Sequence, residues 1–168
     1  MRGKDLKRKK IQWFKLAVCL AIPLAAGGLS AFLTRDSMKI FGSLAQPPLS
    51  PPAWLFPVMW TALYILMGLA CYFVITSPKV RYENRPDMHR ALFWYGLQLF
   101  FNFCWPIAFF ILRVWMISLI WLAVMEILII AVTVSFAKFS GKAVLMMIPY
   151  ILWTAFAGYL NWGIFILN

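Results

Sequence analysis

The chain has 168 residues, of which 64% are hydrophobic and 12% charged, and its net charge is +11. Soluble domains contain about 45–50% apolar and about 25% charged residues, so this composition excludes an ordinary soluble enzyme or binding domain. It predicts an all-α integral membrane protein whose length suits one domain of four to six helices.

Basic residues crowd the start of the chain, where seven of the 16 Lys and Arg residues lie within the first 15 positions. No soluble domain follows that could use them to hold nucleic acid, so we expect no nucleic-acid partner. We interpret residues 1–10 as a basic cytoplasmic N-terminal extension that lies on anionic lipid headgroups. The apolar run after it continues to about Leu33, too long for a signal peptide, so we expect an uncleaved first helix and a membrane domain over residues 11–168.

Five segments are apolar and long enough to cross a membrane, which takes about 20 residues. They cover residues 11–33, 53–76, 91–112, 114–137 and 143–167. The sequence therefore predicts a five-transmembrane-helix bundle. The third and fourth helices meet at Arg113, and a turn that short makes them antiparallel neighbours.

The distribution of Lys and Arg predicts how this bundle sits in the membrane. With the N-terminus inside, the inner side holds the seven N-terminal cations, four in residues 77–90 and two in residues 138–142, against three on the outer side. The positive-inside rule therefore predicts a multi-pass protein of the cell membrane with a cytoplasmic N-terminus and an external C-terminus. The proline-rich stretch at residues 47–60 then lies outside.

Aromatic and amide side chains recur at helical spacing in three of the predicted helices, so each set shares one face. The three sets are Trp60, Tyr64, Gly68 and Cys71; Gln98, Asn102, Trp105 and Phe109; and Tyr150, Trp153, Ala157 and Asn161. Amides near the middle of the membrane are costly in hydrocarbon, so they must face protein, water or a ligand. The convergence predicts a pocket for a flat, mostly apolar ligand. For any single residue, helix–helix adhesion or an interfacial aromatic belt stays open.

Other polar and kinking residues in the spans leave two interpretations each. Glu126 lies near the centre of the fourth helix, where it either bonds to a neighbouring helix or subunit or takes part in proton or ligand binding. Pro106 follows Trp105 and predicts a bend beside the amide face. Gly27 and Ala31 permit close helix approach, either within the bundle or at a dimer seam.

Metal chemistry has no visible parts in this sequence. Cys19, Cys71 and Cys104 lie inside apolar runs without metal-ligand spacing, and we interpret them as small membrane-buried residues. His89 lies in a predicted loop. We expect no metal site.

Three long motifs carry a family resemblance. They are PPLSPPAWLFPVMWTALYILMGLACY, QLFFNFCWPIAFF and PYILWTAFAGYLNWGIFILN, in this order and on these helices. They resemble the TspO/MBR family, the tryptophan-rich sensory proteins related to the mitochondrial translocator protein and peripheral benzodiazepine receptor. The resemblance covers about residues 16–168.

The resemblance implies a five-helix membrane bundle, often a homodimer, that binds tetrapyrroles such as protoporphyrin IX and haem and needs no obligatory cofactor. Its lid would be the first loop, with Pro47, Pro48, Pro51, Pro52 and Trp54. Together with the helical faces above, it predicts the ligand-binding residues Trp60, Tyr64, Gln98, Asn102, Trp105, Trp153 and Ala157. The expected function is a receptor, sensor or carrier in porphyrin or stress handling.

Three alternatives stay open. The first is a light-dependent porphyrin-degrading enzyme with Trp60 and Trp153 as its catalytic candidates, the second is a transporter of porphyrin-like metabolites, and the third is a structural partner of other membrane proteins. The chain also departs from the family pattern at Gln46, Leu49 and Pro106. The departures at Gln46 and Leu49 bear on the charge and hydrogen bonding of the lid, and all three bear on the choice of ligand.

Overall fold

The computed structural model describes residues 11–37 and 41–168, and this part of the chain forms helices and connecting loops without strands. In chain order the elements are α1 (Trp13–Thr34), α3 (Leu55–Ile75), the 3₁₀ turn η1 (Tyr82–Asn84), α4 (Arg85–Pro106), the π-helix η2 (Ile107–Ile111), α5 (Trp115–Ala137) and α6 (Gly141–Leu167). The described residues contain five spans that are long and apolar enough to cross a membrane. The predicted five-helix membrane bundle is therefore confirmed.

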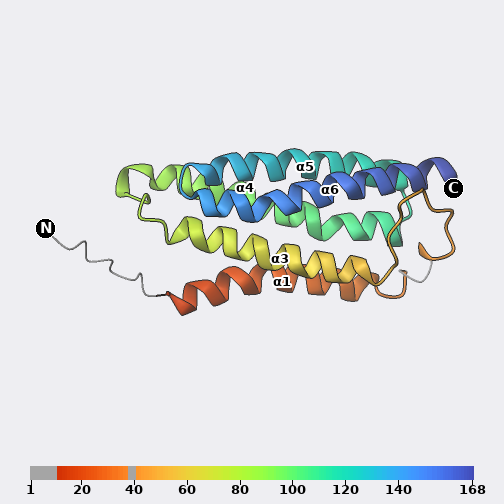
Figure 1. Ribbon diagram of the computed structural model, residues 1–168, viewed down its shortest axis with the longest axis horizontal. Coiled ribbons are helices and arrows are strands. Elements are labelled where there is room, and N and C mark those ends of the chain that lie inside the picture. The colour runs from red at the N-terminus through yellow and green to blue at the C-terminus, as the bar shows by residue number, and fades with distance from the viewer. Residues whose placement is uncertain (1–10, 38–40) are drawn as a thin grey trace, which may run out of the picture.

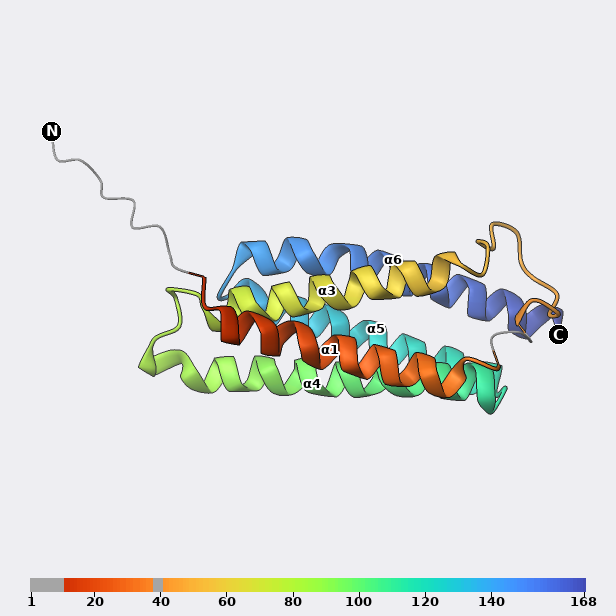
Figure 2. The same ribbon diagram turned by 90° about the horizontal axis from the view of Figure 1, so that it is seen from below.

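The helices run side by side in one elongated bundle, and the beginning of α1 and the end of α6 lie at opposite ends of it (Figure 1). Helix α5 packs between α4 and α6, and α3 packs on α6 and α1. Helix α1 lies at the outside of the bundle, where it contacts α3, α4 and η2 (Figure 2). Helix α1 is also the least buried of the five spans in the described residues.

The third span begins earlier than the sequence predicts, at Arg85 instead of residue 91. Pro86 fits the first turn of a helix, where its missing N–H leaves no hydrogen bond unmade, and Asp87 complements the positive end of the helix dipole. Asp87 also pairs with Lys138 at 3.8 Å and with Arg90 at 4.0 Å. The charged residues of this segment therefore form the first turns of α4 instead of a loop.

At Pro106 the α-helical pattern ends and a π-helix follows. The proline ring has no N–H and crowds the carbonyl group one turn earlier, so the regular ladder cannot continue through it. The N–H of Leu112 instead bonds to the carbonyl of Ile107, five residues back, at 3.0 Å. Arg113 then adopts a left-handed conformation with φ 55°, and α5 starts two residues later. The short antiparallel connection predicted at Arg113 is confirmed.

Small residues let α1 and α3 approach closely. A Cβ atom on Gly68 would lie 2.6 Å from the carbonyl oxygen of Cys19, and one on Gly27 would lie 2.0 Å from the ring of Tyr64. Gly27 therefore serves packing within the bundle. Ala31, its predicted partner for close approach, is exposed.

The charges of the described residues separate along the bundle. Six cations lie in or beside the α3–α4 and α5–α6 connections, at the end where α1 begins: Lys79, Arg81, Arg85, Arg90, Lys138 and Lys142. Arg35 and Arg113 lie at the other end, whereas residues 1–10 and Lys39 lie outside the described residues. This separation fits a multi-pass membrane protein, and the side on which each end lies stays a prediction.

Candidate functional site

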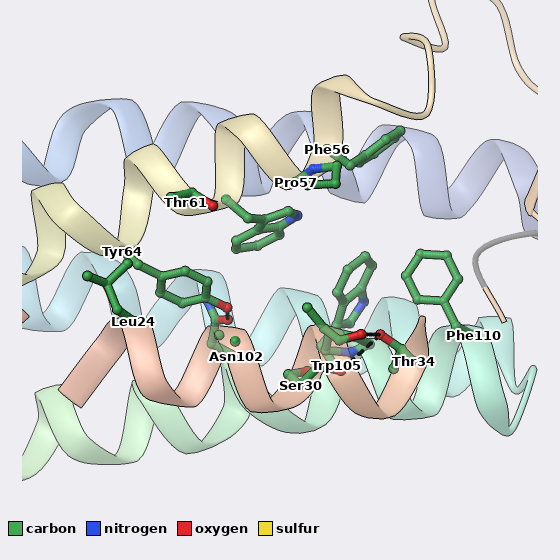
Figure 3. Close-up of a pocket in the computed structure, with 15 residues that line it drawn as sticks. Leu24, Ser30, Thr34, Phe56, Pro57, Thr61, Tyr64, Asn102, Trp105 and Phe110 are labelled. Atoms are coloured by element: carbon green, nitrogen blue, oxygen red, sulfur yellow. Dashed lines mark hydrogen bonds between the residues drawn. The ribbon is translucent and has the colours of Figure 1, made fainter. Parts of the chain in front are cut away.

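A cavity of about 190 Å³ lies between α1, α3 and α4, toward the end of the bundle where α3 begins (Figure 3). The face of α1 that lines it is made mostly of small residues, namely Gly27, Gly28, Ser30, Ala31 and Thr34. Larger side chains from α3, α4 and η2 form the other walls. The cavity therefore exists because the side chains of α1 are too small to fill the space that α3, α4 and η2 enclose.

Two tryptophans form the aromatic wall of the cavity. The rings of Trp60 and Trp105 lie with their centroids 6.1 Å apart and their planes tilted by 34°. Trp105 is stacked on Phe109 behind it at 5.3 Å, and Phe110 closes the side toward the loops. Such faces offer a flat, apolar ligand large contact areas at little cost in conformational entropy.

A hydrogen-bonded polar group borders the cavity at its inner end. The Tyr64 hydroxyl donates to Oδ1 of Asn102 at 2.5 Å, and Nδ2 of Asn102 donates to the Tyr150 hydroxyl at 2.5 Å. Nε2 of Gln98 donates to the same Tyr150 oxygen at 2.6 Å. Three helices are thereby joined by side chains that are all buried. The sequence required these amides to face protein, water or a ligand, and both Gln98 and Asn102 are hydrogen-bonded to protein.

On the α1 side the hydroxyl groups are directed to backbone carbonyls. Ser30 donates to the carbonyl of Phe103 on α4 at 3.0 Å, and Thr34 donates to that of Ser30 at 2.9 Å. The Ser30 bond ties the peripheral helix to α4 beside the cavity. This wall therefore presents mainly methyl groups and glycine backbone to a ligand.

Four of the predicted ligand-binding residues line the cavity together: Trp60, Tyr64, Asn102 and Trp105. Gln98 is fully buried and does not line the cavity, and its side chain is hydrogen-bonded to the Tyr150 hydroxyl. Sequence reasoning assigned Gly27 and Ala31 to helix packing and did not recognise the small residues of α1 as a cavity wall, although Gly27, Ser30, Ala31 and Thr34 recur at helical spacing. Their lack of bulk was the signal.

The two predicted residues of α6 are placed elsewhere. The Trp153 ring packs edge-on against Phe56 with centroids 6.1 Å apart, and it is absent from the lining of the cavity. Ala157 lines a separate hollow of about 20 Å³ with Phe41 and Trp105. Helix α6 instead reaches the residues of the cavity wall through Tyr150, whose ring centroid lies 6.3 Å from that of Trp60.

The predicted lid is held against α6. Pro47 lies so close to Gly163 that an added Cβ would meet its ring at 2.4 Å, and the Tyr159 hydroxyl donates to the carbonyl of Pro48 at 2.7 Å. The Asn168 side chain accepts from the N–H of Ala45 and donates to its carbonyl, both at 3.0 Å.

The other lid residues also stay off the cavity wall. The lining excludes Pro47, Pro48, Pro51, Pro52 and Trp54, and after the loop the chain returns to the cavity at Phe56 and Pro57. Gln46 donates to the carbonyl of Phe41 at 3.0 Å, so this departure from the family pattern stabilises the loop itself. Leu49 is exposed and left-handed, with φ 67°.

Glu126 lies outside the cavity, between α5 and α6. Its carboxyl group is hydrogen-bonded to the Thr154 hydroxyl of α6. Among residues 11–37 and 41–168, no three His, Cys, Asp or Glu side chains gather as metal ligands would.

Comparison with known proteins matches residues 19–167 to the model of the TspO/MBR family. The chain is 35% identical to the tryptophan-rich protein TspO of Chlorobaculum tepidum, over 94% of this chain and 98% of that protein. It is 32% identical to the protein of the same name from Archaeoglobus fulgidus, over 92% and 97%. It is 30% identical to the translocator protein of Bos taurus, over 89% and 88%.

Proposed function

The chain belongs to the TspO/MBR family, and on this premise we propose that it is a membrane receptor, sensor or carrier that binds a tetrapyrrole in the cavity between α1, α3 and α4. The proposal includes a cytoplasmic N-terminus in a cell membrane, from the distribution of Lys and Arg. The observation that carries it is the pairing of two tryptophan faces with a buried hydroxyl–amide group at one cavity.

The chemistry of the walls supports this ligand class. A tetrapyrrole is a broad, flat, mostly apolar ring with a few polar atoms, and Trp60 and Trp105 supply surfaces against which it can stack. Tyr64 and Asn102 supply the hydroxyl and amide that would orient it. A few convergent polar groups on an apolar wall are the usual composition of a ligand site.

The size of the cavity adds a condition. At about 190 Å³ it is smaller than the roughly 300–1,000 Å³ of typical ligand pockets, so a macrocycle requires its walls to separate. The residues that line the cavity and are also exposed lie on facing sides of α1 and α3, namely Gly28, Ala31, Pro57 and Thr61. Because α1 is peripheral, we propose that the site expands by movement of α1 away from α3, opening toward the lipid.

Titration with protoporphyrin IX tests the site. We expect Trp60→Phe and Asn102→Ala each to weaken binding about tenfold, equivalent to about 1.4 kcal/mol, because one reduces the area of a stacking face and the other removes an orienting amide. Trp162→Phe is the matched control, since Trp162 is half-exposed on α6 and absent from the cavity lining.

Binding is followed by tryptophan quenching and by the porphyrin absorption band, so that the loss of a fluorophore is not mistaken for lost affinity. Thermal unfolding of each variant shows whether it has folded. Wild-type affinity in both site variants would refute the site, and absence of binding to the wild type would refute the function.

A further inference from the structure

Two cysteines from different helices lie in contact inside the bundle. Sγ of Cys19 on α1 is 3.7 Å from Sγ of Cys71 on α3, although 52 positions separate them in the chain. Only 6% of Cys19 and 8% of Cys71 is exposed. Both are free thiols, as is Cys104 on α4.

The backbones of α1 and α3 approach closely beside this pair of cysteines. Gly68 precedes Cys71 by one turn on the same face of α3, and a Cβ atom there would lie 2.6 Å from the carbonyl oxygen of Cys19 and 2.9 Å from Cα of Leu20. A disulfide needs its two Cα atoms about 4.4–6.8 Å apart, which is possible only where two helices come unusually near. Gly68 permits such an approach beside the pair, and forming the bond requires the two sulfurs to move from 3.7 Å to about 2.05 Å apart.

We propose that Cys19 and Cys71 form a redox site, at which two thiols convert reversibly to a disulfide that joins α1 to α3. Two S–H bonds break and one S–S bond forms, and the two protons and two electrons pass to a lipid-soluble quinone, which becomes the hydroquinone. The burial of both sulfurs restricts water-soluble oxidants. A quinone dissolved in the bilayer reaches the lipid-facing sides of α1 and α3.

The location of the site gives the disulfide a consequence. Helix α1 carries one wall of the cavity and α3 carries another, and their contacts to each other are noncovalent in the dithiol form. The disulfide would hold the two helices together and oppose the separation that a macrocycle requires. This consequence rests on the proposed function, whereas the formation of the bond does not.

Thiol counting in purified protein tests the proposal. The oxidant is decylubiquinone, whose fully substituted ring has no free C–H position for thiol addition. After denaturation in detergent, maleimide should label three thiols in the reduced wild type and one in the oxidised wild type, and dithiothreitol should restore the count. Peptide mapping should find Cys19 joined to Cys71, with the loss of two hydrogen atoms.

Substitution of each cysteine gives the controls. Cys104→Ser should lose both of its remaining thiols on oxidation, whereas Cys19→Ser and Cys71→Ser should keep both of theirs. Three labelled thiols in the wild type after prolonged oxidation would overturn the proposal. So would equal thiol loss in Cys19→Ser, because it would show that Cys104 or contact between molecules is responsible.

A second pair of variants tests the geometry. Gly68→Ala should force α1 and α3 apart and slow disulfide formation at least about fivefold, since the sulfurs no longer reach bonding geometry. Gly96→Ala is the matched control, because an added Cβ there meets nothing within 4 Å, and its rate should equal that of the wild type. Equal rates in Gly68→Ala and the wild type would contradict the close approach.

Comparing protoporphyrin IX binding in the dithiol and disulfide forms separates this inference from the proposed function. Slower association after oxidation, reversed by dithiothreitol and absent in Cys71→Ser, supports the consequence for the cavity. A disulfide that forms in a protein without porphyrin binding would refute the proposed function and leave the redox site intact. Porphyrin binding in a protein whose thiols resist oxidation would do the reverse.

Discussion

Tyr150 is the residue on which the buried polar group depends. Its hydroxyl oxygen accepts one N–H bond from Asn102 and one from Gln98, so one side chain of α6 pairs with donors of two amides of α4. Inside a bundle that faces lipid, no water is available to accept a hydrogen bond from these amides. A buried donor without a partner costs about 1–3 kcal/mol. The Tyr150 hydroxyl therefore contributes to stability mainly by pairing the amide donors of Asn102 and Gln98.

Tyr150→Phe should accordingly destabilise the protein by about 2 kcal/mol or more, because it leaves two amide donors unpaired while preserving the ring. Thermal unfolding in detergent measures the loss. Tyr82→Phe, at an exposed position, is the control and should unfold like the wild type. An unchanged transition in Tyr150→Phe would show that the amides find other partners.

At the same scale, the position of Glu126 favours a structural role. Its carboxyl group bonds to Thr154 on the neighbouring helix and lies outside the cavity lining. The contact matches the first of the two interpretations drawn from the sequence, in which Glu126 bonds to a neighbouring helix.

At the scale of the element, the first loop is tied to α6 at three points, through Pro47, Pro48 and Ala45. Its prolines restrict the conformations of the free chain, which lowers the entropy lost when the loop docks. The glycine at position 163 is required because the ring of Pro47 occupies the place of a side chain.

Gly163→Ala should therefore detach the loop without unfolding the bundle. We expect faster hydrogen exchange across residues 42–54 and unchanged exchange in α3 and α5. Gly158→Ala on the same helix is the control, because an added Cβ there meets only a Leu122 methyl group at 3.6 Å, an ordinary contact. Loop exchange that is equally slow in both variants would contradict the docking role of Gly163.

At the scale of the whole molecule, the five helices and the uneven charges predict one orientation in the membrane. Cysteine substitutions at two exposed positions, Leu49→Cys and Arg81→Cys, report on opposite ends of the bundle. With the native cysteines replaced by serine, a membrane-impermeant maleimide added to intact cells should label position 49 and spare position 81. The reverse pattern would overturn the predicted orientation.

By itself, the sequence determined the membrane class, the five spans, the short turn at Arg113 and the family motifs. These features depend on local composition and on the length that a bilayer demands, so they can be derived without knowing which helices touch. It also selected Trp60, Tyr64, Asn102 and Trp105, because side chains at helical spacing on one helix necessarily share a face.

Only the tertiary structure decided which faces meet. It placed α1, with its small residues, against α3 and α4 around the cavity, and it turned Trp153 and the prolines of the loop elsewhere. It also brought Cys19 and Cys71 into contact across 52 positions. Periodicity specifies which residues share a face of a helix but not which helix that face contacts. The contact depends on the distances between all neighbouring helices, which are set by residues such as Gly27 and Gly68.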